Sequence, residues 1–114
     1  MTALLRGHIQ CALTRTSLIT VHFRDLVHAP EPSRRRIREL QGEYVELWVA
    51  VLAQLYPALD PRDARAAVHA VFGLLNSTPY SLRVGRTAMA RILLEMSLAS
   101  FAAVGESASR REAG

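Results

Sequence analysis

Two apolar stretches decide the fold of this chain: GEYVELWVAVLAQLY at Gly42–Tyr56 and ARAAVHAVFGLLNSTPYS at Ala64–Ser81. In both stretches the apolar residues recur every three or four positions, which is typical of helices that bury one side. The seven residues between them, PALDPRD at positions 57–63, combine the end of one helix with the start of the next. The sequence therefore predicts two consecutive helices joined by a tight corner.

The start of the second helix is marked by three residues with separate roles. Asp60 can cap the helix because its carboxylate can accept a hydrogen bond from a free backbone N–H group. Pro61 suits the first helical position, where no N–H donor is needed. Asp63 places a negative charge near the positive end of the helix dipole.

The same periodicity, followed outward, predicts an all-α fold, a bundle of about five helices. The helices are expected at about residues 3–14, 18–28, 34–56, 61–76 and 85–104. Pro30 and Pro32 are expected to end the second helix, and Ser33 is placed to cap the third. The last ten residues, GESASRREAG at 105–114, are polar and are expected to form a disordered tail. The folded domain is thus expected to span residues 1–104.

Composition agrees with one soluble helical domain. The chain has 114 residues, half of them hydrophobic, which is enough for a single core. No run reaches the roughly 18 uninterrupted apolar residues that a membrane span needs, and the N-terminus does not resemble a signal peptide. The single cysteine, Cys11, cannot form an internal disulfide, so a cytoplasmic location is expected.

The net charge of +4 does not by itself indicate a nucleic-acid partner. All fourteen basic residues are arginine, and they are spread over both halves of the chain. Only Arg34, Arg35 and Arg36, followed by Arg38, form a cluster, and no aromatic residues interleave it as in single-strand binders. Direct binding of nucleic acid by this chain is not expected.

The last two helices are apolar over more than one face, and a helix of this kind must be buried on several sides. A second copy of the chain would supply the missing cover, with a two-fold axis making one patch serve both subunits. The alternative is that both faces pack within the monomer. The residues expected at the dimer interface are Ala66, Ala70, Gly73, Leu74, Leu94, Leu98 and Phe101.

A family resemblance supports this interpretation. The helix with a tyrosine and a tryptophan one turn apart, the Asp60-Pro61 cap and the segment AVHAVFGLLNS at 67–77 together resemble the C-terminal half of TetR-type bacterial regulators. The resemblance runs from about residue 18 to residue 104. It implies an effector-binding domain that dimerises through its last two helices as a four-helix bundle. No helix-turn-helix precedes these helices, so the chain is expected to lack the DNA-reading domain and not to bind operator DNA by itself.

The resemblance also implies where an effector binds, because these regulators hold their ligands among the second, third and fourth of the expected helices. Tyr44 and Trp48 lie four apart and share a helix face, and three residues of the next helix share another. A pocket of this kind suits a small apolar or amphipathic ligand. The alternative is that these side chains are ordinary core. The expected ligand-binding residues are His22, Phe23, Tyr44, Trp48, His69, Phe72 and Asn76.

The arginine cluster has two interpretations. Arg34, Arg35 and Arg36 at a helix start are unfavourable for the dipole, and an anion there would be stabilised by both the free N–H groups and the guanidiniums. Some regulators that the chain resembles respond to acyl-coenzyme A thioesters, whose phosphates need such a partner. The alternative is a solvated face with no ligand.

Catalytic and metal sites are not expected. His8 and Cys11 have a spacing compatible with a metal, and three further histidines could add ligands, but no carboxylate accompanies them. The chain has no nucleophile-elbow pattern, phosphate loop or dinucleotide fingerprint, so no enzyme activity and no cofactor are expected. Two alternatives stay open: a stand-alone helical interaction module, and a small enzyme using His69 or Tyr44 for acid–base chemistry.

Overall fold

A computed structural model describes residues 1–14, 30–77 and 84–114, and these form four helices without strands. This part of the chain confirms the all-α prediction. The helix expected at 18–28 lies outside the described residues. The helices are α1 (Thr2–Thr14), α3 (Glu31–Leu55), α4 (Pro61–Ser77) and α5 (Arg86–Ala113).

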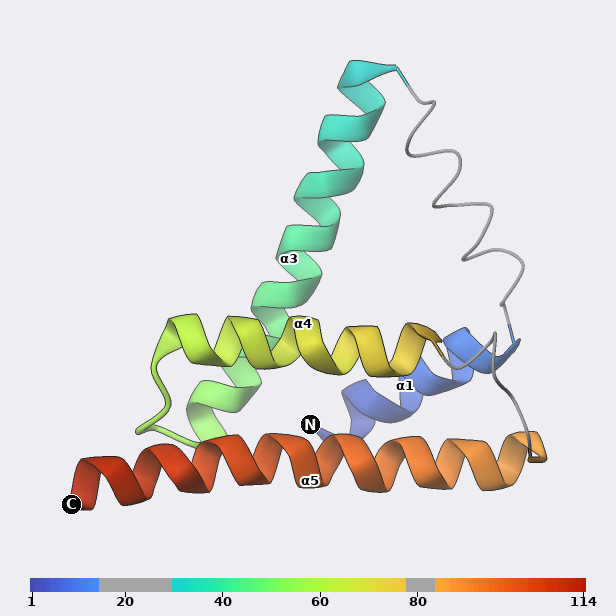
Figure 1. Cartoon of the computed structure of the whole chain (residues 1–114). Helices are drawn as coiled ribbons and strands as arrows, with labels where there is room; N and C mark the ends of the chain where they lie inside the picture. The colour runs from blue at the N-terminus through green and yellow to red at the C-terminus, as the bar shows by residue number, and fades with distance from the viewer. Residues whose placement is uncertain (15–29, 78–83) are drawn as a thin grey trace.

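Helices α4 and α5 run in opposite directions beside one another and form one layer (Figure 1). α1 packs mainly against α5, whereas α3 packs mainly against α4 and crosses it steeply. The first half of α3 extends away from the other described helices (Figure 1). Only the second half of α3 therefore contributes buried residues, which are Val45, Trp48, Val49 and Leu52.

The core is centred on Trp48, whose side chain is fully buried. Each helix contributes apolar residues to one continuous cluster around it. Three-residue and four-residue spacing explains this burial, because it places these side chains on one face of each helix. Leu5 and Ile9 come from α1, Val68 and Leu75 from α4, and Leu93 and Phe101 from α5.

The corner between α3 and α4 has the predicted construction. The Asp60 carboxylate accepts a hydrogen bond from the Arg62 backbone N–H at 2.8 Å, and Pro61 begins α4. At the end of α3 the Tyr56 N–H donates to the Leu52 carbonyl at 2.8 Å. Leu59 is buried within the corner. The predictions of a cap at Asp60 and of a helix starting at Pro61 are therefore confirmed.

The predicted start of α3 at Arg34 was wrong, because the helix begins at Glu31. Pro32 lies in the first turn, where a proline costs no intrahelical hydrogen bond, so it starts this helix instead of ending the previous one. Pro30 occupies the capping position, and no side chain caps the helix. Ser33 is therefore an ordinary helical residue.

The predicted disordered tail was also wrong, because α5 continues to Ala113. Gly105 and Ala108 are buried. A Cβ atom at position 105 would overlap the ring of Tyr56, so the helix backbone passes directly against that ring. The polar composition of residues 105–114 predicted disorder because the residues of this segment that pack against the core are small and give little apolar signal.

The 28-residue α5 is long and apolar enough, by length and composition alone, to cross a membrane. Such a helix is weak evidence for a span, because core helices of soluble proteins pass the same test. One face of α5 is buried against the other helices through Leu93, Ser97 and Phe101.

The molecule is a thin slab with a protruding arm, and it measures 49 × 38 × 19 Å. Its radius of gyration is 15.6 Å, whereas a compact chain of this length would have roughly 13 Å. It exposes 7549 Å², against roughly 6200 Å² expected for a folded monomer of this mass. The thinnest dimension holds only two helix layers, so α4 and α5 each keep a solvent-facing side.

Candidate effector site

Four aromatic rings from three helices meet beside the core. The rings of His8 and Phe72 stack with centroids 4.9 Å apart, and Tyr44 stacks on Phe72 at 5.6 Å. Trp48 meets Phe72 edge-to-face at 4.9 Å. These rings, together with Asn76, form what we call the aromatic cluster, and it joins α1, α3 and α4.

His8 links the three helices through both nitrogens of its ring. Its Nδ1 lies 3.0 Å from the Tyr44 hydroxyl, and its Nε2 lies 3.0 Å from the Asn76 Oδ1. With Nε2 donating to the Asn76 carbonyl, the neutral imidazole accepts from the Tyr44 hydroxyl at Nδ1. One side chain of α1 thus satisfies polar groups of α3 and α4 at once.

The indole Nε1 of Trp48 is buried and has no acceptor in standard hydrogen-bond geometry among the described residues. It interacts only with the Tyr44 hydroxyl, closely enough to offset part of the rise that burial causes in the pKa of that group. A buried donor without a partner costs about 1–3 kcal/mol, so most such groups in folded proteins find one. The Trp48 ring adjoins the rings of His8, Tyr44 and Phe72. The cluster therefore offers an incompletely satisfied N–H donor beside a partly exposed aromatic surface, where a ligand acceptor would be favourable.

Burial raises the pKa of the Tyr44 hydroxyl above its ordinary value, and hydrogen bonding from the Trp48 side chain partly offsets this effect. The neutral phenol is therefore the form that the folded protein favours. The contribution of Tyr44 to stability is fully present below the pKa of about 10 that the tyrosine has in the unfolded chain. It is lost as pH rises through the higher pKa of Tyr44 in the folded protein.

Chemical unfolding at rising alkaline pH should show a loss of stability that is smaller in Tyr44→Phe. An identical pH dependence in the variant would contradict this assignment.

Four of the seven predicted ligand-binding residues come together, namely Tyr44, Trp48, Phe72 and Asn76. His69 does not join them: it is exposed, on the side of α4 that carries Ala66, Ala70 and Gly73. Periodicity placed it near Asn76, but His8 of α1 reaches Phe72 and Asn76, whereas His69 lies on another side of α4. His22 and Phe23 lie outside the described residues.

The place of His8 in the aromatic cluster was not predicted, because its spacing from Cys11 suggested only a metal ligand. A signal existed, because His8 lies four residues from both Leu4 and Ala12, which are apolar and at least partly buried. A polar residue on that line of α1 needs partners on the facing helices. The described residues contain no group of three potential metal ligands among histidine, cysteine, aspartate and glutamate. Cys11 is a free, exposed thiol on the same helix.

The arginines at the start of α3 are engaged in ion pairs. Arg34 contacts the Glu31 carboxylate, and Arg38 pairs with the same carboxylate at 3.0 Å. Arg36 pairs with Glu39 at 3.2 Å. Arg35 is exposed beside them. Because Glu31 already supplies a negative charge in the first turn, this geometry favours a solvated, internally paired face over the predicted anion site.

The residues predicted at the dimer interface fall into three groups. Ala66, Ala70 and Gly73 are exposed on α4. Leu74, Leu94 and Leu98 are half-buried and pack at the edge of the core. Phe101 is only 2% exposed, and its ring lies 6.4 Å from that of Trp48. Phe101 therefore belongs to the core of the single chain, so its interface assignment was wrong.

The comparison with known protein families agrees with this architecture. The family model described as tetracyclin repressor-like, C-terminal domain matches residues 1–80. This range covers α1, α3 and α4 and therefore the whole aromatic cluster. The all-helical slab is thus a regulator domain of the effector-binding and dimerisation type.

The chain belongs to the tetracyclin repressor-like C-terminal domain family, as the TetR resemblance predicted. This is a family of regulatory domains, not of enzymes. No curated protein shows a significant match to the chain.

Proposed function

We propose that this chain is the effector-sensing and dimerisation domain of a TetR-like transcriptional regulator. It acts in the cytoplasm as a homodimer, binds a small apolar or amphipathic ligand and does not bind operator DNA by itself. Family membership supports the class. The observation that carries the ligand site is the buried Trp48 N–H, which has no acceptor in standard geometry among the described residues, beside a cluster of stacked rings.

The aromatic cluster suits a flat ligand with a hydrogen-bond acceptor. Such a ligand would stack on Phe72 and accept the Trp48 N–H. To enter, it must separate Phe72 from the ring of His8, which stacks on it. Displacing His8 breaks its bonds to Tyr44 and Asn76, which are polar contacts that tie α1 to α3 and α4. Ligand binding and the position of α1 are thereby coupled.

Binding of such a ligand should be detectable by the fluorescence of Trp48, the single tryptophan. We expect aromatic ketones such as acetophenone to change the Trp48 emission and to raise the thermal midpoint, because binding stabilises the folded state. Phe72→Trp should block the surface on which the ligand stacks and abolish the thermal shift while leaving the oligomeric state intact. His69→Ala, on the exposed side of α4, is the matched control and should bind normally. Saturable binding that persists in Phe72→Trp would place the ligand elsewhere.

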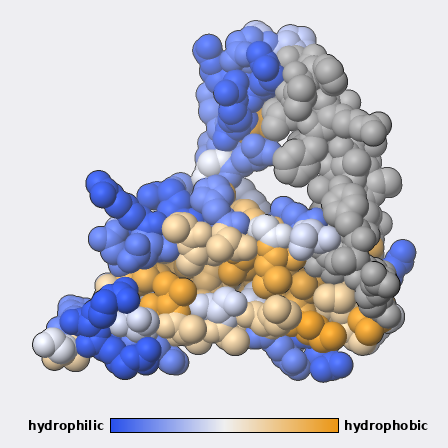
Figure 2. Space-filling view, in the orientation of Figure 1, coloured by the Kyte–Doolittle hydropathy of each residue, from blue (hydrophilic) through white to orange (hydrophobic). Residues whose placement is uncertain are grey.

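Dimerisation is supported by the surface as well as by the family. Apolar residues gather over α4 and α5 on the face shown in Figure 2. Met96 is 48% exposed on α5, and the small residues of α4 lie exposed.

Replacing Ala70 with arginine should convert the dimer into a monomer. The substitution places a charged side chain on a face where two helices approach closely, and a buried unpaired charge is strongly unfavourable. Ala53→Arg, at an exposed position of α3, is the matched control and should remain dimeric. Sedimentation at micromolar concentration would distinguish the two variants. A monomeric unmodified chain would contradict the proposal and favour a stand-alone module that binds another protein.

A further inference from the structure

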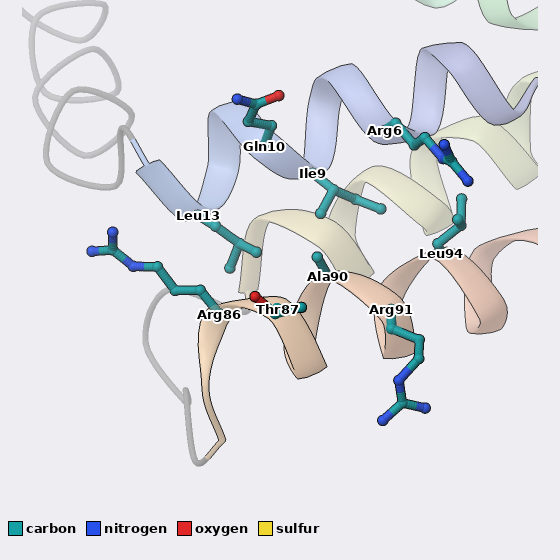
Figure 3. Close-up of a pocket in the computed structure, with 9 residues that line it drawn as sticks. All are labelled: Arg6, Ile9, Gln10, Leu13, Arg86, Thr87, Ala90, Arg91 and Leu94. Atoms are coloured by element: carbon teal, nitrogen blue, oxygen red, sulfur yellow. The ribbon is translucent and has the colours of Figure 1, made fainter.

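A groove separate from the aromatic cluster lies between α1 and the first half of α5 (Figure 3). Its volume is about 510 Å³, which falls within the range of about 300–1,000 Å³ typical of small-molecule sites. The residues that line it are Arg6, Ile9, Gln10, Leu13, Arg86, Thr87, Ala90, Arg91 and Leu94.

The floor of the groove is apolar. Ile9 and Leu13 of α1 face Ala90 and Leu94 of α5 across it (Figure 3). Ile9 and Leu13 are buried, whereas Ala90 and Leu94 are half-buried. The floor therefore suits a hydrocarbon chain or another apolar body lying along the two helices.

The rim of the groove is positively charged. The described lining residues include three arginines and no carboxylate. Arg91 points away from α1 (Figure 3) and lies 3.7 Å from Glu95. Within the described part of the chain, Arg6 and Arg86 form no ion pair, so their charges are available to a ligand.

The two available arginines mark the ends of the groove. Arg86 lies at the Leu13 end, where its side chain extends outward past Leu13, and Arg6 extends toward Leu94 at the other end (Figure 3). The first turn of α5 has no acidic residue and no side-chain cap, so nothing there opposes a bound anion. From Arg86 to Leu94 the helix rises roughly 12 Å, at about 1.5 Å per residue.

We propose that this groove is a second ligand site, which takes an amphipathic anion with an apolar chain and a single carboxylate. The carboxylate pairs with the Arg86 guanidinium and the Thr87 hydroxyl, and the chain lies over Leu13, Ile9 and Ala90. The apolar chain of the ligand covers the floor of the groove and removes it from water. The arginine at the rim favours a carboxylate over a neutral alcohol of the same length. This site stands independently of the effector function proposed for the aromatic cluster.

Both sites share α1, which gives the second site a route to affect the first. His8 points from α1 to the aromatic cluster, while the neighbouring Ile9 faces the groove. A ligand in the groove acts on α1 from the side opposite to His8. A ligand in the groove need not change the aromatic cluster. The existence of the second site is therefore tested by measuring ligand binding to the groove, not by measuring an effect on the cluster.

Isothermal titration with decanoate, kept below its micelle-forming concentration, tests the site directly. We expect saturable binding, binding at least tenfold weaker in Arg86→Gln, and no comparable binding of decanol. Arg62→Gln, which removes an exposed arginine on α4 outside the groove, is the matched control and should bind like the unmodified chain. Equal affinity for decanoate in Arg86→Gln, or equal affinity for decanol, would overturn the proposal.

Two further variants test whether decanoate occupies this groove and not another part of the molecule. Ala90→Phe fills the floor of the groove and should abolish decanoate binding, with circular dichroism confirming that it folds. Phe72→Trp should bind decanoate normally, because the aromatic cluster is a different site; loss of binding there would assign decanoate to the cluster instead. If Ala90→Arg yields a monomer while the unmodified dimer does not bind decanoate, the groove is occupied by a second copy, and the proposal falls.

Discussion

Replacing Gly105 with alanine is expected to destabilise the domain by about 1–3 kcal/mol, the range for overpacking a well-packed core. The added Cβ would overlap the Tyr56 ring near its attachment point, so the ring cannot move aside without changing its rotamer. Tyr56 also ends α3, and its N–H is bonded to Leu52, so its backbone is held in place. Denaturant unfolding monitored by circular dichroism would measure the change.

Gly42 provides the matched control for this substitution. It lies inside α3, as Gly105 lies inside α5, but a Cβ there would meet no atom within 4 Å. Gly42→Ala should therefore gain stability, by up to about 1 kcal/mol, from helix propensity alone. The two substitutions are chemically identical and have opposite expected signs. If both stabilised the protein equally, the close contact between α5 and Tyr56 would be refuted.

The substitution Trp48→Ala is expected to have the largest effect on stability, about 3–5 kcal/mol. A domain of this length has a total stability of roughly 6–17 kcal/mol, so the loss is a large fraction of it. Trp48 is fully buried, and its ring contacts His8 of α1, Phe72 of α4 and Phe101 of α5. Its removal therefore leaves a cavity where all four described helices meet.

The adjacent residue Leu47 is the natural comparison. Its side chain is 51% exposed, so Leu47→Ala removes few buried contacts and should change stability by less than about 1 kcal/mol. Thermal unfolding of the two variants, read by circular dichroism, would give the contrast. A similar loss in both would mean that α3 buries a different face from the one described.

The sequence predicted the elements well where a single local rule decided the outcome. The α3–α4 corner followed from Asp60 and Pro61, whose capping and first-turn preferences do not depend on the rest of the fold. The start of α3 was misplaced because proline both ends helices and begins them, and local sequence does not say which role Pro32 has. The end of α5 was missed because small residues such as Gly105 carry little periodic signal, although they pack closely.

The candidate site was predicted less completely, for a reason that concerns tertiary contacts. Periodicity brought Tyr44 and Trp48 to one face, and Phe72 and Asn76 to another, and the fold places these faces together. It could not say how far α1 extends along α4, which excludes His69 and brings in His8. Periodicity also assigned Phe101 to an interface. An apolar residue on a helix face can pack against a neighbouring helix of the same chain or against a second subunit, and the sequence pattern does not distinguish the two.

The exposed thiol of Cys11 gives this molecule a built-in optical ruler. The chain has one cysteine and one tryptophan; the first is exposed on α1, and the second is buried in α3. A fluorophore attached to the thiol would accept excitation energy from the indole with an efficiency set by their separation. Displacement of α1 relative to α3 can therefore be followed in real time on the natural sequence, without introducing a single substitution.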